Sequence, residues 1–348
     1  MRTTHTLHIG DARDLSALKT ASVHLVVTSP PYPMIEMWDE SFGLAVPEVS
    51  RQLAEGRGMA AFESMHGALD EVWAECLRVL GAGGFLCVNI GDATRTLGGE
   101  FALYPNHARI IAAMMRLGLT PLPDILWRKP TNAPNKFMGS GMLPAGAYVT
   151  YEHEYVLIFR KGGKRVFSGT EQAARAKSAY FWEERNLWFS DVWTDVRGIR
   201  QKLGADGLRD RSAAFPFELP WRLMHMYSLQ GDTVLDPFVG TGTTMAAAFA
   251  AGRSSVGVER SEQLAPRVGA ALHDAVSEGR RRAQCRLAAH EAFMAARLAA
   301  GKAAAHVSAV YGFPVVTRQE RALSLVAPRG LTETGPGQWV GEHGGLLP

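Results

Sequence analysis

The stretch from Val234 to Glu259 limits the possible folds of this chain more than any other. An apolar run ending at Asp236 is followed by a turn containing Gly240 and Gly242, a helix of small residues and a second short strand. Glycines let the backbone approach a ligand closely, and a helix N-terminus favours an anionic group. The order strand, turn, helix, strand predicts part of a doubly wound α/β sheet with its ligand at the carboxyl ends of the strands.

The acid at the end of the second strand indicates the type of ligand. Glu259 lies twenty-three residues after Asp236, close to the spacing at which an acidic side chain accepts hydrogen bonds from ribose hydroxyls. The lysine that a phosphate-cradling P-loop needs after its last glycine is missing. The segment therefore predicts a site for a nucleoside that carries no triphosphate.

A second informative segment, Thr-Ser-Pro-Pro-Tyr-Pro at residues 28–33, follows the apolar run 23–27. Two consecutive prolines fix φ, supply no N–H and favour extended geometry in the preceding residue. A rigid strand end of this kind can present a hydroxyl, a free carbonyl and an aromatic ring to a planar amine. Taken alone, the segment fits a simple proline turn as well. The candidate catalytic residues are Ser29, Pro30, Pro31 and Tyr32.

Together, the two segments resemble the motifs of S-adenosylmethionine-dependent DNA amino-methyltransferases. The glycine-rich segment resembles the family's cofactor motif and residues 29–32 resemble its catalytic motif. The catalytic motif comes first, as in the permuted beta class, and residues 125–130 and 153–159 resemble two further family blocks. The resemblance spans residues 5–270. It implies a Rossmann-like, mostly parallel sheet and S-adenosyl-L-methionine as the cofactor.

The resemblance also assigns residues to the cofactor. Asp11 closes a segment similar to the one that contacts adenine, and Phe215 with Pro216 resembles an element that packs on the cofactor. The implied cofactor-binding residues are Asp11, Phe215, Pro216, Asp236, Pro237, Phe238, Gly240, Gly242, Thr243, Thr244 and Glu259. In the permuted order, the strands that end near Asp11 and at Glu259 are expected to be neighbours, although they lie near opposite ends of the family region.

One position bears on the substrate. Most adenine-modifying members of the family carry Asp or Asn where this chain has Ser29, whereas Ser-Pro-Pro-Tyr is typical of members that methylate the N4 amine of cytosine. Ser29 Oγ and the Pro30 carbonyl could each accept one amine hydrogen in either case. The resemblance thus favours cytosine, with adenine as the alternative. RNA or protein-amide methylation and a non-catalytic nucleic-acid-binding module are the remaining alternatives.

The target base must leave the duplex stack, and Tyr32 is the first candidate to stack on it. Trp127 is a second candidate, although a core tryptophan fits its position equally well. Residues 160–212 carry twelve Lys/Arg against seven Asp/Glu where relatives place target recognition; a solvated surface insertion is the alternative. The residues assigned to DNA are Trp127, Arg128, Lys129, Lys164, Arg165, Arg197, Arg200 and Lys202.

The three cysteines argue against another type of methylation. Transfer to a ring carbon requires a thiolate, usually in a Pro-Cys context, and no cysteine here follows a proline. Few, scattered cysteines predict a reducing cytoplasm, and no Cys/His cluster has metal-ligand spacing, so no metal is expected. No apolar run is long enough to span a bilayer. The expected partner is double-stranded DNA, and a homodimer and a cognate restriction endonuclease are compatible with it.

The chain divides into five predicted regions. These are a catalytic half (1–160), a target-recognition region (161–212), a cofactor-binding half (213–275), a helical C-terminal extension (276–327) and a loosely ordered tail (328–348). Apolar spacing predicts helices over residues 69–80 and 108–117 and a buried strand at residues 84–90. Residues 34–66 are poorly patterned and fit a lid, a DNA-facing loop or a simple connector.

Overall fold

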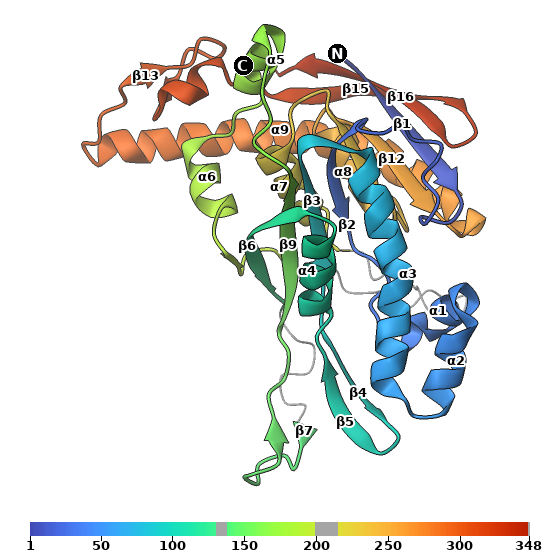
Figure 1. The fold of residues 1–348 in the computed structure, drawn as a ribbon. Helices are drawn as coiled ribbons and strands as arrows, with labels where there is room; N and C mark the ends of the chain where they lie inside the picture. Colours follow the sequence, from blue (N-terminus) through green and yellow to red (C-terminus); the bar gives the residue numbers. More distant parts are fainter. Residues whose placement is uncertain (130–137, 199–214, 347–348) are drawn as a thin grey trace.

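A ten-stranded sheet forms the centre of the computed structural model, which describes residues 1–129, 138–198 and 215–346 (Figure 1). The strand order is β10 (Val192–Trp193), β6 (Leu119–Arg128), β9 (His153–Lys161), β3 (Leu80–Ile90), β2 (Val23–Thr28), β11 (Thr233–Asp236), β12 (Ser254–Glu259), β1 (Arg2–Ile9), β16 (Gln338–Gly345) and β15 (Val326–Gly335). β9 and β16 run antiparallel to both of their neighbours, and the other adjacent pairs are parallel. The predicted doubly wound, mostly parallel sheet is confirmed.

Helices and three short strand pairs complete the described structure. The helices are η1 (Glu36–Trp38), α1 (Asp39–Ala45), α2 (Pro47–Ala54), α3 (Gly58–Val79), α4 (Asn106–Arg116), α5 (Gly169–Lys177), α6 (Trp182–Trp188), α7 (Glu218–Tyr227), α8 (Thr243–Ala250), η2 (Glu262–Leu264), α9 (Ala265–Ala299) and η3 (Arg318–Ala322). The pairs are β4 (Ala93–Leu97) with β5 (Glu100–Tyr104), β7 (Met138–Gly139) with β8 (Ala147–Tyr148), and β13 (His306–Val307) with β14 (Pro314–Val315).

Strand β2 shows why the sheet is covered on both faces. Its successive side chains point to opposite sides, so Val26 packs in a cluster with α3 and α4, whereas Leu25 and Val27 pack in a cluster with α7 and α8. A strand buried on both faces needs apolar side chains at successive positions rather than at alternate ones. This explains the three successive apolar residues, Leu25 to Val27, that precede the catalytic motif.

Residues 34–66, which the sequence left unassigned, are mostly helical. They contain η1, α1, α2 and the beginning of α3, which starts at Gly58 and so extends the predicted helix over 69–80 toward its N-terminus. Pro47 occupies the first turn of α2, where its missing N–H costs nothing. Arg95 of β4 holds Asp39 of α1 through two hydrogen bonds of 2.9 and 2.7 Å. The segment is therefore a packed helical layer.

The permuted order produces the expected meeting of distant segments. β1 pairs in parallel with β12, and Ile9 lies opposite Glu259 in the register. Asp11 follows the end of β1, and Glu259 ends β12, so the two residues lie near the ends of adjacent strands. On the other side of β1 the sheet continues with β16, in which Trp339 lies opposite His5.

The predicted loose tail at 328–348 is wrong for its described part. β15 and β16 form an antiparallel hairpin that joins the sheet. Trp339, Gly341 and His343 are all buried at alternate positions, and a Cβ at Gly341 would lie 2.5 Å from a ring carbon of Phe249. The glycines near 335–337 mark the hairpin turn, where Gly337 has a φ of 68°.

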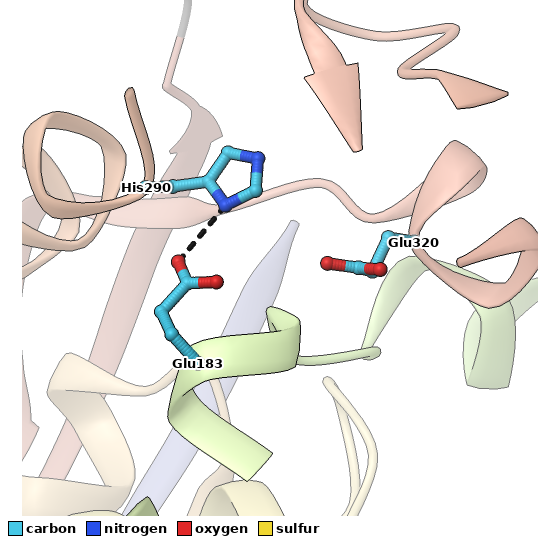
Figure 2. A group of neighbouring side chains, drawn as sticks. All are labelled: Glu183, His290 and Glu320. Carbon is cyan, nitrogen blue, oxygen red and sulfur yellow. Dashed lines mark hydrogen bonds and ion pairs between the residues drawn. The ribbon is translucent and has the colours of Figure 1, made fainter. Parts of the chain in front are cut away.

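A buried ionic cluster joins the predicted C-terminal extension (276–327) to α6 in the predicted target-recognition region (161–212). His290 of α9 bonds Glu183 of α6 through Nδ1 (2.9 Å) and the Pro314 carbonyl through Nε2 (3.1 Å), and Glu320 of η3 accepts the Trp182 N–H (2.9 Å). Figure 2 shows the bond between His290 and Glu183, with the Glu320 carboxylate directed toward the two. Because both ring nitrogens face acceptors, the imidazolium is the favoured form. Burial lowers the pKa of His290, but its bond to Glu183 and the nearby carboxylates outweigh burial and raise it.

We predict that Glu183→Gln lowers the free energy of unfolding by about 1 to 2 kcal/mol near pH 6, because a charged hydrogen bond is lost. A raised His pKa stabilises the fold fully below the unfolded value of 6.5, and this contribution disappears as the pH rises through the folded pKa. The difference should thus shrink by about pH 9 in urea titrations. Exposed Glu291 supplies the matched control, Glu291→Gln, and an unchanged difference at the two pH values would contradict the ion pair.

Candidate active site

The catalytic and cofactor motifs follow neighbouring strands. β2 and β11 are parallel, with Leu25 opposite Val234 and Val26 opposite Leu235. Residues 29–32 continue from β2 and residues 237–242 continue from β11, so the two loops leave the same edge of the sheet side by side. Parallel α/β sheets bind their ligands at this carboxyl edge.

One cavity of about 700 Å³ joins the two loops. Of the predicted residues, its wall includes Asp11, Ser29, Pro30, Pro31, Phe215, Asp236, Pro237, Phe238, Gly240, Thr243, Thr244 and Glu259. Tyr32, Pro216 and Gly242 do not line it. Trp38 of η1 and Phe42 of α1 form a further part of the wall. The sequence did not indicate these two residues. The volume is in the range typical of sites for small organic cofactors.

Asp236 organises the loops with its carboxylate. Its Oδ1 accepts hydrogen bonds from Thr28 Oγ1 (2.6 Å) and the Phe238 N–H (3.0 Å), and its Oδ2 accepts one from Thr244 Oγ1 (2.5 Å). Burial raises the pKa of Asp236 to about 6, although these three bonds favour the ionised form. The carboxylate thus joins the end of β2, the glycine-rich turn and the first turn of α8.

The glycine-rich turn requires its glycines. Gly240 and Gly242 have φ values of 54° and 91°, in the left-handed region, and a Cβ at Gly242 would approach the Val268 backbone to 3.0 Å. The Gly240 N–H donates to Glu259 Oε2 (3.1 Å) and the Ser261 N–H donates to Oε1 (2.9 Å). Burial raises the pKa of Glu259, while these backbone bonds oppose the rise. Glu259 is therefore held as a fixed acceptor in the cavity wall.

Beside Glu259, the cavity lining carries a basic side chain next to Asp11. Arg13 donates from Nε to Asp11 Oδ1 (3.1 Å) and from Nη2 to Oδ2 (2.8 Å). The bond from Arg13 lowers the pKa of Asp11, and burial opposes this effect. The wall therefore presents an ion pair rather than a free acid.

The cavity suits S-adenosyl-L-methionine on chemical grounds. Glu259 is an acceptor for ribose hydroxyls, Trp38 and Phe238 are aromatic surfaces for a purine, and the first turn of α8 has no side-chain cap on its N–H groups and can receive a carboxylate. The methionine sulfonium supplies an electrophilic methyl group when the cofactor is bound. Ser29 and Pro30 line the same cavity, where they can orient an amine toward the methyl group of the bound cofactor.

Beside the cavity, Tyr32 belongs to a polar network that the sequence did not predict. Its hydroxyl donates to Glu154 Oε2 (3.0 Å) and accepts from Asn89 Nδ2 (2.8 Å) and Ser29 Oγ (3.2 Å). Asn89 also donates to Glu154 (2.7 Å), and Lys129 forms an ion pair with the other carboxylate oxygen. Burial raises the pKa of Tyr32 well above its ordinary value, with the Glu154 charge as the next cause.

The predicted role of Trp127 as a base-stacking surface is wrong. Its side chain is 1% exposed, and its indole N–H donates to the Val196 carbonyl (2.8 Å). β9 and β10 flank β6, and the ring belongs to a buried cluster with Trp193 and Val196. Lys129, next but one along the chain, lies over this ring at 4.9 Å and is paired with Glu154, so its charge is directed at the network around Tyr32.

Lys164 and Arg165 lie at the wrong edge for the predicted DNA contact. β9 runs antiparallel to β3, so the residues that follow it return to the amino ends of the parallel strands. Arg165 there pairs with Asp232, which precedes β11, at 2.7 Å. The catalytic loop leaves the opposite edge.

Two other basic residues do lie at the catalytic edge. Arg128 ends β6, and Arg197 follows β10, which is parallel to β6. Both are exposed, and Arg128 has one surface partner, Glu152, at 3.2 Å. Arg200 and Lys202 lie outside the described residues.

Neither a cysteine nor a group of described residues with metal-binding proximity lies in the cavity wall. The cluster of Glu183, His290 and Glu320 is the one group of His and carboxylates with metal-binding proximity within the described ranges, and none of the three lines the cavity. Cys76 and Cys87 are buried in the core, where burial raises the pKa of both thiols, and Cys285 is exposed on α9. Within the described residues, no helix combines the length and hydropathy needed to cross a membrane.

A doubly wound sheet with a cavity between the catalytic motif and the glycine-rich turn is the architecture of a Rossmann-like methyltransferase. A profile of the DNA methylase family that comprises N6 and N4 enzymes matches residues 23–268. The chain therefore belongs to this family of S-adenosyl-L-methionine-dependent DNA methyltransferases.

Individual relatives agree with this assignment. The chain is 48% identical over 331 residues to the type II methyltransferase M.MthZI of Methanothermobacter thermautotrophicus, covering 94% of this chain and 92% of the relative. It is 48% identical over 275 residues to M.MjaI of Methanocaldococcus jannaschii, covering 76% and 89%. The structure resembles a candidate DNA modification methylase of Thermus thermophilus solved with S-adenosyl-L-methionine, with a TM-score of 0.61, 34% identity and coverage of 78% and 96%.

We predict that Glu259→Ala raises the dissociation constant for the cofactor by about 10- to 100-fold, because hydrogen bonds to a charged acceptor are lost. Tyr32→Ala should leave this constant within about 2-fold, since Tyr32 lies outside the cavity wall, while turnover collapses. Isothermal titration with S-adenosyl-L-methionine measures both variants. Loss of cofactor binding in Tyr32→Ala would contradict the separation of the two sites.

Proposed function

We propose that this enzyme methylates the exocyclic N4 amine of a cytosine that is extruded from duplex DNA. The observation that carries the proposal is the shared cavity, in which Ser29 and Pro30 lie on one wall with the glycine-rich loop. A reacting amine placed against these residues is within reach of the cofactor site. The preference for cytosine rests on Ser29, at the position where most adenine-modifying relatives carry Asp or Asn.

The residues of the catalytic loop act on the amine through its hydrogens. The amine lone pair is delocalised into the base, and accepting both N–H hydrogens favours a tetrahedral nitrogen whose lone pair is available for in-line attack. Ser29 Oγ is one acceptor, and the Pro30 carbonyl, which receives no hydrogen bond from the described residues, is the other. Tyr32 offers its ring to the extruded base, while Asn89 and Glu154 fix the position of its hydroxyl.

Arg128 and Arg197 are proposed to hold the duplex at this edge by contacting phosphates. Both are exposed at the edge of the sheet from which the catalytic loop leaves, and basic side chains supply most of the sequence-independent affinity for DNA. Of the predicted target-recognition region 161–212, we propose only the part around β10 and Arg197 for this role, because Lys164 and Arg165 lie at the opposite edge of the sheet. The relatives named above are called type II methyltransferases, which supports a modification role alongside a restriction endonuclease of matching sequence specificity.

The product identifies the substrate directly. The enzyme is incubated with duplex DNA and labelled cofactor, the DNA is digested to nucleosides, and the labelled nucleoside is identified by mass spectrometry. We predict N4-methyldeoxycytidine. N6-methyldeoxyadenosine would contradict the choice of base, and label found only in RNA or protein would contradict the choice of polymer. Bound cofactor without any methylated product would favour a non-catalytic binding module.

We predict that Arg128→Ala and Arg197→Ala each weaken duplex binding and reduce the slope of log affinity against log salt by about 1, because one phosphate contact is lost. Fluorescence anisotropy at several salt concentrations measures both effects. Lys164→Ala is the matched control, since exposed Lys164 lies at the opposite edge of the sheet. Equal effects of all three substitutions would indicate non-specific electrostatics instead of a defined duplex path.

A further inference from the structure

The Ser29 hydroxyl presents a problem for the proposed mechanism. A hydroxyl can donate as well as accept, and it is a weaker acceptor than the carboxylate that an Asp would supply. If the hydroxyl hydrogen of Ser29 pointed at the target amine, it would face the N–H hydrogens of the amine, and Ser29 Oγ could not accept them. The structure must therefore direct this hydrogen elsewhere.

The polar network around Tyr32 determines where the Ser29 hydroxyl hydrogen points. An ionised Glu154 carboxylate has no hydrogen to donate, so the hydrogen between Glu154 Oε2 and Tyr32 Oη, which are 3.0 Å apart, belongs to Tyr32. Asn89 Nδ2 lies within 2.8 Å of Tyr32 Oη and 2.7 Å of Glu154 Oε2, so its amide must face both oxygens with its N–H groups. Tyr32 Oη can then only accept from Ser29 Oγ, at 3.2 Å.

We propose that Glu154 is a positioning residue that, through the Tyr32 hydroxyl, makes Ser29 an obligate hydrogen-bond acceptor for the target amine. With its hydrogen committed to Tyr32, Ser29 Oγ turns its lone pairs to the amine. Hydrogen bonds in a chain polarise one another, so the Glu154 charge also strengthens Ser29 as an acceptor. Glu154 thus gives a serine part of the character that a carboxylate would have at the same position.

The surroundings of Glu154 fit this role. Its side chain is 14% exposed, and Lys129 pairs with Oε1, which leaves Oε2 to Tyr32 and Asn89. Gly91 lies against both partners, because a Cβ there would come within 3.2 Å of Glu154 Cγ and of the Tyr32 ring. The close packing holds the carboxylate and the phenol at a fixed separation. The inference rests on the amine methylation proposed above and applies to cytosine and adenine alike.

The test compares Glu154→Gln, Tyr32→Phe and the double variant in single-turnover methylation, with saturating cofactor and duplex. Glutamine can donate to Tyr32 and reverse the chain, and phenylalanine keeps the ring while removing the relay. Each single change should lower the rate about 10- to 100-fold, as expected for a lost bond to a charged group. Because both changes break one chain, the double variant should be no slower than the slower single variant.

Two further measurements separate positioning from folding and from binding. The dissociation constants for cofactor and for duplex should stay within about 3-fold in all three variants. Glu152→Gln supplies a matched control, since half-buried Glu152 lies two residues away and contacts Arg128 instead of Tyr32, and its rate at saturating duplex should match that of the wild type.

Multiplicative rate losses in the double variant would overturn the relay, and so would a Glu154→Gln variant that weakens duplex binding at an unchanged rate. Both outcomes are read against an active wild type. Failure of the proposed function itself would appear instead as a wild-type enzyme that methylates no base amine.

Discussion

The buried Asp236 carboxylate is the interaction on which the arrangement of the site depends. It binds Thr28 at the end of β2, the backbone of Phe238 in the glycine-rich turn and Thr244 in the first turn of α8. The residue after Thr28 is Ser29, so one carboxylate fixes the start of the catalytic loop relative to the cofactor turn. Burial opposes its charge and raises its pKa to about 6, yet three donors converge on it. Removing one partner of such a network leaves buried groups unpaired and costs more than the individual bonds contribute.

Around this carboxylate, the sheet brings together segments that lie far apart in the chain. β11 lies between β2 and β12, so the catalytic loop, the glycine-rich turn and Glu259 all emerge from the same edge. β1 follows next and brings Asp11 and Arg13 to the cavity from the start of the chain. The permuted motif order therefore leaves the site intact, because the order of strands in space decides which side chains meet.

Local patterns in the sequence pointed to residues that line one cavity in the structure. Residues 29–31 and most of 236–244 lie in its wall, and prolines or glycines set the backbone in both segments. Asn89 and Glu154 were missed because they reach Tyr32 only through the pairing of β3 with β9, in which Asn89 lies opposite Val156. The one feature of the sequence that could have indicated Glu154 is its place near the start of the family block at residues 153–159. Trp127 illustrates the opposite error, since its burial depends on β10, a two-residue edge strand.

The central claim is that one cavity places the cofactor against the Ser29–Tyr32 loop. A crystal structure with S-adenosyl-L-methionine or a stable analogue tests it most directly. The account predicts the ribose at Glu259, the amino-acid end near the first turn of α8 and the sulfonium facing Ser29 and Pro30. A cofactor bound elsewhere, or bound with its sulfonium turned away from Ser29, would contradict the account.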